Sequence, residues 1–120
     1  MDREIEEFVS QNSIDYIPLD SLGITRGAFE KDAALIIISF LREEIIPVLG
    51  IDVYILKDNA VMFPKVYTNW YSIRLPNEPM GEYAERTCQE AKSFLRSYNS
   101  NEGLPVFDIY VYDFCQHYIQ

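Results

Sequence analysis

The sequence predicts an α+β fold: a small, mostly antiparallel sheet of three or four strands, with helices packed on one face. Three segments place apolar residues at the spacing of an amphipathic helix, and others alternate between apolar and polar residues as half-buried strands do. The expected order is helix, helix, strand, strand, a further strand, helix, strand. The 120 residues suffice for one hydrophobic core and contain no repeats or linkers, so we expect a single domain over residues 1–120.

The first helix is expected over residues 2–12, where Ile5, Phe8 and Val9 follow the i, i+3, i+4 pattern between charged residues. An irregular connection should follow over residues 13–27. Turn-forming residues mark this connection, namely Pro18, Gly23 and Gly27.

The second helix is expected to begin near residues 29–31 and to run to about residue 44. Its apolar residues extend almost all round the helix, so it should be central or partly covered by a partner. Three consecutive isoleucines, residues 36–38, favour a strand as the competing interpretation. The helical spacing, with charges at both ends of the segment, favours the helix.

Residues 48–75 predict a strand, a turn at residues 57–60 and one or two further strands, with Pro64 at an edge or bulge. A third helix is expected with Asn77 or Glu78 as its cap and Pro79 in its first turn, and it should end at residues 99–103. The alternating segment at residues 104–114 predicts the last strand.

Strand parity sorts the side chains by face. In the first long strand, one face carries Ile51, Val53 and Ile55. In the last strand, one face carries Phe107, Ile109 and Val111. Both apolar faces should pack against the helices. In the middle segment Trp70 is expected to point inward with Val66, leaving its neighbours exposed. We therefore expect a solvated, partner-binding face formed by Asp52, Tyr54, Asn69, Tyr71, Asp108, Tyr110 and Tyr112. The alternative is a bare sheet face on which cross-strand tyrosine pairs stabilise the fold without a partner.

The net charge of −9 and the pI near 4.4 disfavour direct binding to nucleic acid or to anionic membranes. A basic protein partner would instead be attracted to such a chain. The alternative is that the acidity serves solubility alone. Tyrosine supplies nine residues, and its apolar ring with a polar tip suits a surface that is both soluble and adhesive.

Catalytic, metal and cofactor motifs are not evident. His117 is the single histidine, and phosphate-binding glycine motifs do not occur, so no metal and no cofactor are expected. Asp52 and Asp108 as a general acid–base pair form a minor alternative. Cys88 and Cys115 lack metal-site spacing, and whether they pair remains open. The acidic N-terminus and an apolar run of only residues 33–41 predict a cytoplasmic protein that does not span a membrane.

Three blocks of the sequence carry a resemblance to a known family. They are LGITRGAFEKDAALIIISFLREEIIPVLGIDVY at residues 22–54, YTNWYS at residues 67–72 and EYAERTCQEAKSFLRSY at residues 82–98. They resemble the immunity protein 40 family of bacterial polymorphic toxin systems, with its I-P-V-L-G-G-D-V-Y, Y-D-N-W-Y and R-S-x-x-x-A patterns. The sequence departs from these patterns at Ile51, Thr68 and Thr87, which replace glycine, aspartate and serine.

The resemblance implies a non-enzymatic cytoplasmic antidote that binds a cognate toxin and blocks it. The acidity fits such a role, because a basic nuclease needs positive charge to hold nucleic acid and an acidic face could occupy that surface. Two alternatives stay open: a self-associating module that forms a homodimer through the helix at residues 29–41, and a small carboxylate-based hydrolase.

Overall fold

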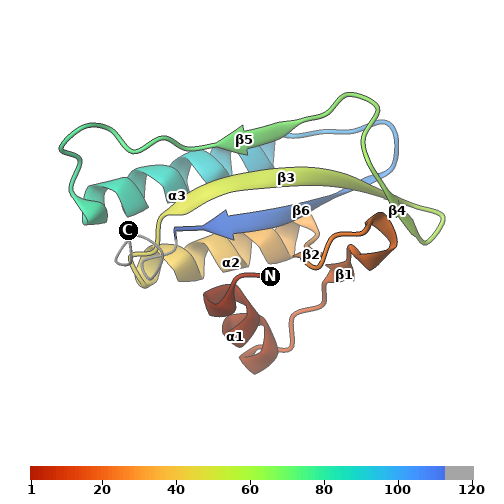
Figure 1. Ribbon diagram of the computed structural model, residues 1–120, viewed down its shortest axis with the longest axis horizontal. Coiled ribbons are helices and arrows are strands. Elements are labelled where there is room, and N and C mark those ends of the chain that lie inside the picture. The colour runs from red at the N-terminus through yellow and green to blue at the C-terminus, as the bar shows by residue number, and fades with distance from the viewer. Residues whose placement is uncertain (113–120) are drawn as a thin grey trace.

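The computed structural model describes residues 1–112, and their arrangement is shown in Figure 1. The helices are α1 (Arg3–Gln11), α2 (Lys31–Glu43), α3 (Met80–Ser97) and a short 3-10 helix, η1 (Asp20–Leu22). The strands are β1 (Ile17–Pro18), β2 (Gly27–Ala28), β3 (Val48–Lys57), β4 (Ala60–Met62), β5 (Asn69–Tyr71) and β6 (Leu104–Val111). The predicted α+β fold is confirmed.

The main sheet is built around β3, which pairs antiparallel with every other strand of this sheet. β6 runs along one side of β3 for nearly its whole length, and β4 and β5 follow one another along the other side. In this register Ile51 lies between Trp70 of β5 and Ile109 of β6. β1 and β2 form a separate two-stranded hairpin, and a bridge between Phe29 and Phe107 joins its end to the outer edge of β6.

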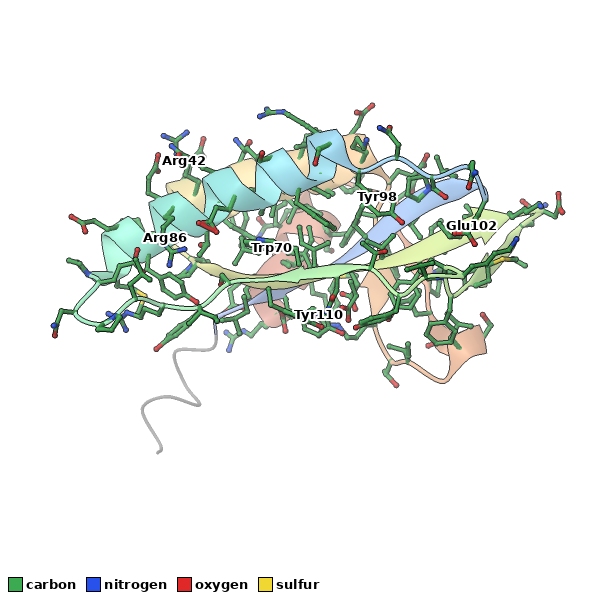
Figure 2. All side chains as sticks on the ribbon, turned by 90° about the horizontal axis from the view of Figure 1, so that it is seen from above. Arg42, Trp70, Arg86, Tyr98, Glu102 and Tyr110 are labelled. Atoms are coloured by element: carbon green, nitrogen blue, oxygen red, sulfur yellow. The ribbon has the colours of Figure 1, made fainter. Side chains whose placement is uncertain are left out.

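The main core lies between one face of this sheet and the helices. Figure 2 shows α2 and α3 together on the same side, with Trp70 between them and the sheet. As parity predicted, Ile51, Val53, Phe107 and Ile109 point into this core, where each is at most 1% exposed. α1 adds Ile5 and Val9 to the same core, and the ring of its Phe8 stacks on Phe40 of α2.

A second, smaller apolar cluster lies at one end of the opposite face of the sheet. It joins Tyr54 and Val106 to Leu19, from the segment predicted to be an irregular connection, and to Ala28, directly after that segment. That segment instead folds as the β1–β2 hairpin with η1 at its tip, and it covers part of the face that was expected to be open. Figure 1 shows it beside β6 and the β3–β4 end of the sheet.

The segment between β4 and β5 also differs from expectation. Val66 was grouped with the inward-pointing Trp70, but β5 begins only at Asn69 and Val66 is 76% exposed. Strand alternation therefore applies to residues 69–71 and does not extend back to Val66.

Candidate functional site

Six of the seven predicted partner-binding residues share the sheet face opposite α2 and α3. Directly paired residues of antiparallel strands point to the same face. Asp52 of β3 pairs with Asp108 on one side and with Asn69 on the other, while Gly50 pairs with Tyr110 and Tyr71. Tyr54 lies two residues beyond Asp52 on β3 and so points the same way. The parity argument is confirmed for these residues.

Tyr112 is separated from this group. It lies one residue past the end of β6, where its backbone N–H donates to the carbonyl of Pro47. Its ring contacts the ring of Tyr83 on α3, with 6.2 Å between the ring centres. The structure therefore places the Tyr112 ring against α3, beyond the end of β6.

The expectation that this face is solvated is wrong for three of the residues. Asp108 is 1% exposed, Asp52 is 8% exposed and Tyr54 is 5% exposed. Tyr54 is covered by the small apolar cluster of the β1–β2 hairpin. The two aspartates are buried because they are hydrogen-bonded within the protein, as buried carboxylates must be.

Arg26 is the residue that satisfies Asp108. Its Nε donates to Asp108 Oδ2 at 2.8 Å, and one Nη donates to the carbonyl of Ile109 at 2.9 Å. Its guanidinium also lies over the ring of Tyr110, 3.8 Å from the ring centre, and reaches Asp2 at 3.4 Å. Burial raises the pKa of the Asp108 carboxyl, and the hydrogen bond from Arg26 opposes that rise.

Asp52 is satisfied by tyrosine hydroxyls in place of a cation. Tyr71 donates to Asp52 Oδ1 at 2.7 Å, and Tyr67 donates to the same oxygen at 3.2 Å. Asn69 in turn donates to the Tyr67 hydroxyl at 3.4 Å. Burial raises the pKa of Tyr71, and the hydrogen bond to Asp52 raises it further, whereas the hydrogen bond with Asn69 lowers it. Because the net change is a rise, Tyr71 is a neutral donor at ordinary pH.

Gly50 makes the Tyr71–Asp52 contact possible. A Cβ atom at Gly50 would overlap the ring of Tyr71, so the glycine leaves the space in which that ring lies across β3. From this position the Tyr71 hydroxyl reaches Asp52, two residues further along β3.

Four aromatic side chains remain accessible around the buried carboxylates, and we call them the aromatic patch: Phe63, Tyr67, Tyr71 and Tyr110. Phe63 packs on Tyr54 and is 54% exposed, Tyr67 and Tyr71 are 64% and 53% exposed, and Tyr110 is half-buried beside Arg26. Figure 2 shows Tyr110 on the side of the sheet away from the helices. The patch thus combines rigid rings with polar tips, as residues that dominate protein interfaces do.

Sequence reasoning missed Arg26 and Phe63 and did not include Tyr67 among the partner-binding residues. Tyr67 has the parity of Asn69 and Tyr71, so the same pattern could have included it. Two aspartates predicted on one sheet face were a signal for Arg26, since neighbouring carboxylates there require a compensating cation. Nothing in the pattern pointed to Phe63, which precedes Pro64 outside a strand.

A separate network fastens the segment after β5 to α3. Arg86 of α3 donates to both carboxylate oxygens of Glu78 at 2.8 Å, to Glu90 and to the carbonyl of Ile73. The hydrogen bond from Arg86 holds the pKa of Glu78 at about 2. Next to it, buried Thr87 accepts the backbone N–H of Val48 at 3.0 Å. These contacts fix the start of β3 and the segment that follows Tyr71, the residue of the patch in β5.

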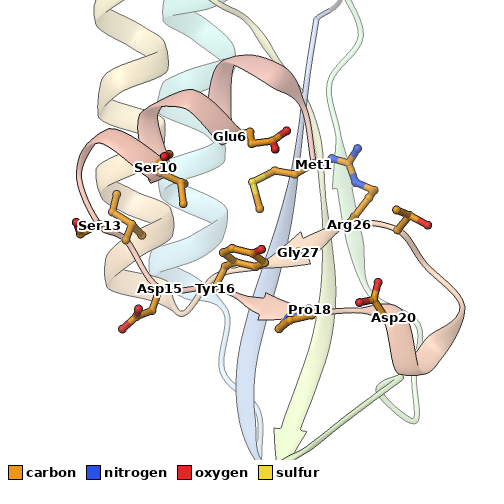
Figure 3. A pocket seen from close by; sticks show the side chains of 13 residues that line it. Met1, Glu6, Ser10, Ser13, Asp15, Tyr16, Pro18, Asp20, Arg26 and Gly27 are labelled. Carbon is orange, nitrogen blue, oxygen red and sulfur yellow. The ribbon is translucent and has the colours of Figure 1, made fainter.

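A cavity of about 690 Å³ lies between α1 and the β1–β2 hairpin. Figure 3 shows Tyr16 in its middle, with Met1, Glu6 and Arg26 around it. Neither Asp52 nor Asp108 lines it. The Arg26 guanidinium is already engaged by Asp108 and Asp2, so it is not available to a ligand in this cavity.

Other functional features are sparse in the described residues. Within residues 1–112 no group of three or more His, Cys, Asp or Glu side chains could hold a metal ion. No helix within that range is long and apolar enough to cross a membrane. Cys88 is buried, which raises its pKa to about 11. The predictions that involve Cys115 and His117 lie outside the described residues.

The fold and this face define a small α+β protein in which tyrosines surround two carboxylates on an antiparallel sheet. Residues 18–111 match the family described as Immunity protein 40, and the chain belongs to this family. The resemblance seen in the sequence is thereby confirmed. No curated protein matches the chain, and no solved structure matches it.

The family's typically non-enzymatic role is to neutralise a toxin. The sequence blocks that carried the resemblance lie together in the structure. The G-x-D-x-Y block supplies Gly50 and Asp52. The Y-x-N-W-Y block supplies Tyr67 and Tyr71, whose hydroxyls donate to Asp52, and Asn69, which donates to Tyr67. The third block supplies the Arg86 and Thr87 contacts with neighbouring segments. All three blocks thus build or support the aromatic patch.

Proposed function

We propose that the chain neutralises a cognate bacterial toxin in the cytoplasm by binding it stoichiometrically through the aromatic patch, without catalysis. The observation that carries this proposal is the clustering of two exposed tyrosines, Tyr67 and Tyr71 from one of the family's sequence blocks, around Asp52 from another. Three other predicted residues have supporting roles. Asp108 bonds to Arg26 and Tyr54 packs in the small apolar cluster, so both help to hold this face of the sheet in place. Asn69 orients Tyr67 by donating to its hydroxyl.

The net charge of −9 supports a basic toxin, for which a nuclease is the leading candidate because it must hold a phosphate backbone. An acidic inhibitor and a basic toxin attract one another over long range, which speeds association. Binding of nucleic acid or of a membrane by the chain itself is disfavoured for the same reason.

The two alternatives have weaker support. A hydrolase centred on Asp52 and Asp108 would need both carboxylates free to reach a substrate, whereas Asp108 is 1% exposed and bound to Arg26. Self-association through α2 was suggested by its wide apolar surface. That surface is covered by α1, α3 and the sheet, and Ile36 is the one large apolar residue of α2 counted as exposed.

The test is a binding titration between the purified chain and its cognate toxin domain. Tyr67→Ala should weaken binding by about tenfold or more, as truncation of a central interface tyrosine does. Ile36→Ala, which removes an exposed apolar side chain on the helix layer, is the matched control and should bind as the wild type does. Circular dichroism should show both variants folded. Wild-type affinity of Tyr67→Ala and of Tyr71→Phe would rule out the patch.

A further inference from the structure

Two carboxylates lie opposite each other on the polar sheet face, and they differ in their bonding partners. Asp108 and Asp52 are direct cross-strand partners in the β3–β6 register. Each has tyrosine nearby: Tyr110 lies beside the Asp108 pair, and Tyr67 and Tyr71 bond to Asp52. The difference is that Asp108 holds a guanidinium, from Arg26, and Asp52 holds none.

Asp52 pairs with no lysine or arginine of the chain. All ten lysine and arginine residues lie within the described range, and the ion pairs found there do not include Asp52. Its hydrogen bonds within residues 1–112, from the hydroxyls of Tyr67 and Tyr71, both go to Oδ1. Within residues 1–112 Oδ2 accepts no hydrogen bond, and Asp52 keeps 8% of its surface exposed.

The surroundings of Oδ2 favour a positively charged group. Asp52 lies directly across from Asp108, and the guanidinium that bonds to Asp108, that of Arg26, is already shared with Asp2. The rings of Tyr67 and Tyr71 are more than half exposed while their hydroxyls hold Asp52 in place. A carboxylate oxygen with exposed aromatic rings beside it attracts a cation both by charge and through the ring faces.

We propose that Asp52, with Tyr67 and Tyr71, is the receptor for an arginine side chain of the protein partner. Arg26 provides the pattern for this contact, because its planar guanidinium both pairs with Asp108 and stacks on Tyr110 at 3.8 Å. A guanidinium suits such a site better than an ammonium group, because it is planar and weakly hydrated. This inference rests on the proposed function and specifies the chemistry that the patch recognises.

The first experiment needs no toxin. The ¹⁵N-labelled full chain is titrated, with NMR detection, with acetyl-Gly-Arg-Gly-amide and, separately, with acetyl-Gly-Gln-Gly-amide. The arginine peptide should produce saturable shifts centred on residues 50–54 and 67–71, and the glutamine peptide should not. Equal shifts with the two peptides, or shifts centred elsewhere, would overturn the proposal.

Asp52→Asn keeps the shape and an acceptor for the tyrosine hydroxyls but removes the charge. It should weaken binding of the arginine peptide by about tenfold. Asp58→Asn removes the same charge from the exposed β3–β4 turn, where Asp58 has a φ of 53° that asparagine also tolerates, and should leave binding unchanged. Equal affinities of the two variants would overturn the proposal.

The second experiment repeats the toxin titration with Asp52→Asn. A loss of about tenfold or more is expected. If Asp52→Asn binds the toxin normally while Tyr67→Ala does not, the arginine receptor is wrong and the aromatic patch stands. If neither substitution affects toxin binding, the patch itself is wrong as well.

Discussion

Gly50 and Tyr71 face each other across the β3–β5 pair, and the pair explains why a glycine stands in the middle of a central strand. Glycine normally weakens a strand, since it has no side chain to pack and is flexible when unfolded. Here the missing Cβ provides the space that the Tyr71 ring occupies, and the ring brings a hydroxyl to Asp52 at 2.7 Å. The absence of a side chain at Gly50 thereby positions the large side chain of Tyr71.

Gly50→Ala should displace the Tyr71 ring and lower the free energy of unfolding by about 1–3 kcal/mol, through overpacking and a weakened hydrogen bond. Chemical denaturation measures the change. Gly81→Ala is the control, because a Cβ there meets no atom within 4 Å in the first turn of α3, and it should be neutral or slightly stabilising. Equal unfolding midpoints for Gly50→Ala and the wild type would contradict this account.

The elements differ in how far the sequence determines them. α1 and α2 were predicted within one or two residues, because each carries an apolar stripe of helical period over several turns. α3 was predicted by the same pattern, but Pro79 caps it in place of Asn77 or Glu78, and it ends at Ser97, before the predicted end at residues 99–103. The competing strand interpretation of the three isoleucines in α2 fails because Ile37 and Ile38 are buried in the core while Ile36 is exposed, a pattern of a helix face. β3 and β6 were predicted from alternation, which also gave the correct side for Asp52 and Asp108.

The β1–β2 hairpin was not predicted, and its absence from the prediction explains the error about Tyr54 and Asp108, which the hairpin and the adjacent Arg26 cover. Its strands have two residues each, too few to show alternation, and they are held by docking on Tyr54 and Val106 and by the bridge from Phe29 to β6. Periodicity reports which face a side chain points to. It does not report what covers that face, because the cover comes from a distant part of the chain.

Glu78 ties the segment after β5 to α3, and this link should depend on pH. Its pKa is about 2 in the folded protein, chiefly because of Arg86, against an ordinary value of 4.5. A lowered folded pKa contributes stability that is fully present above pH 4.5 and is lost as the pH falls from 4.5 towards 2. Glu78→Gln should therefore destabilise the protein at pH 6 and should lose less stability than the wild type below pH 4.5.

The measurement is the free energy of unfolding of wild type and Glu78→Gln between pH 2 and pH 6 at constant ionic strength, roughly the range of carboxyl titration. Glu82→Gln, at an exposed position in the first turn of α3, serves as the control for loss of one negative charge. A constant difference between wild type and Glu78→Gln across this range would show that the Arg86 contact is not what stabilises the segment.

At the scale of the whole molecule, Arg26 joins parts that are far apart in the sequence. It connects the β1–β2 hairpin to Asp2 before α1 and to Asp108 and Ile109 in β6, while Asp2 also accepts the backbone N–H of Val111. The start of the chain, the hairpin and the last strand thus meet at one guanidinium. The aromatic patch depends on this junction, since Tyr110 stacks on Arg26.

Arg26→Met should therefore be among the most destabilising single substitutions, because it leaves Asp108 buried without its partner. A loss of about 3 kcal/mol or more in the free energy of unfolding is expected for a broken buried pair. Arg3→Met removes an arginine whose pair with Glu7 is exposed, and it should cost less than about 0.5 kcal/mol. Urea denaturation of the two variants gives the comparison.

A double-mutant cycle separates the charge pair from the packing of the Arg26 stem. Adding Asp108→Asn to Arg26→Met removes the stranded charge, so the double variant should be more stable than the sum of the two single losses predicts. The aromatic patch should respond in the same order, with toxin affinity falling most in Arg26→Met and partly recovering in the double variant. Additive losses would mean that Asp108 and Arg26 act independently, and the junction would then owe its stability to packing alone.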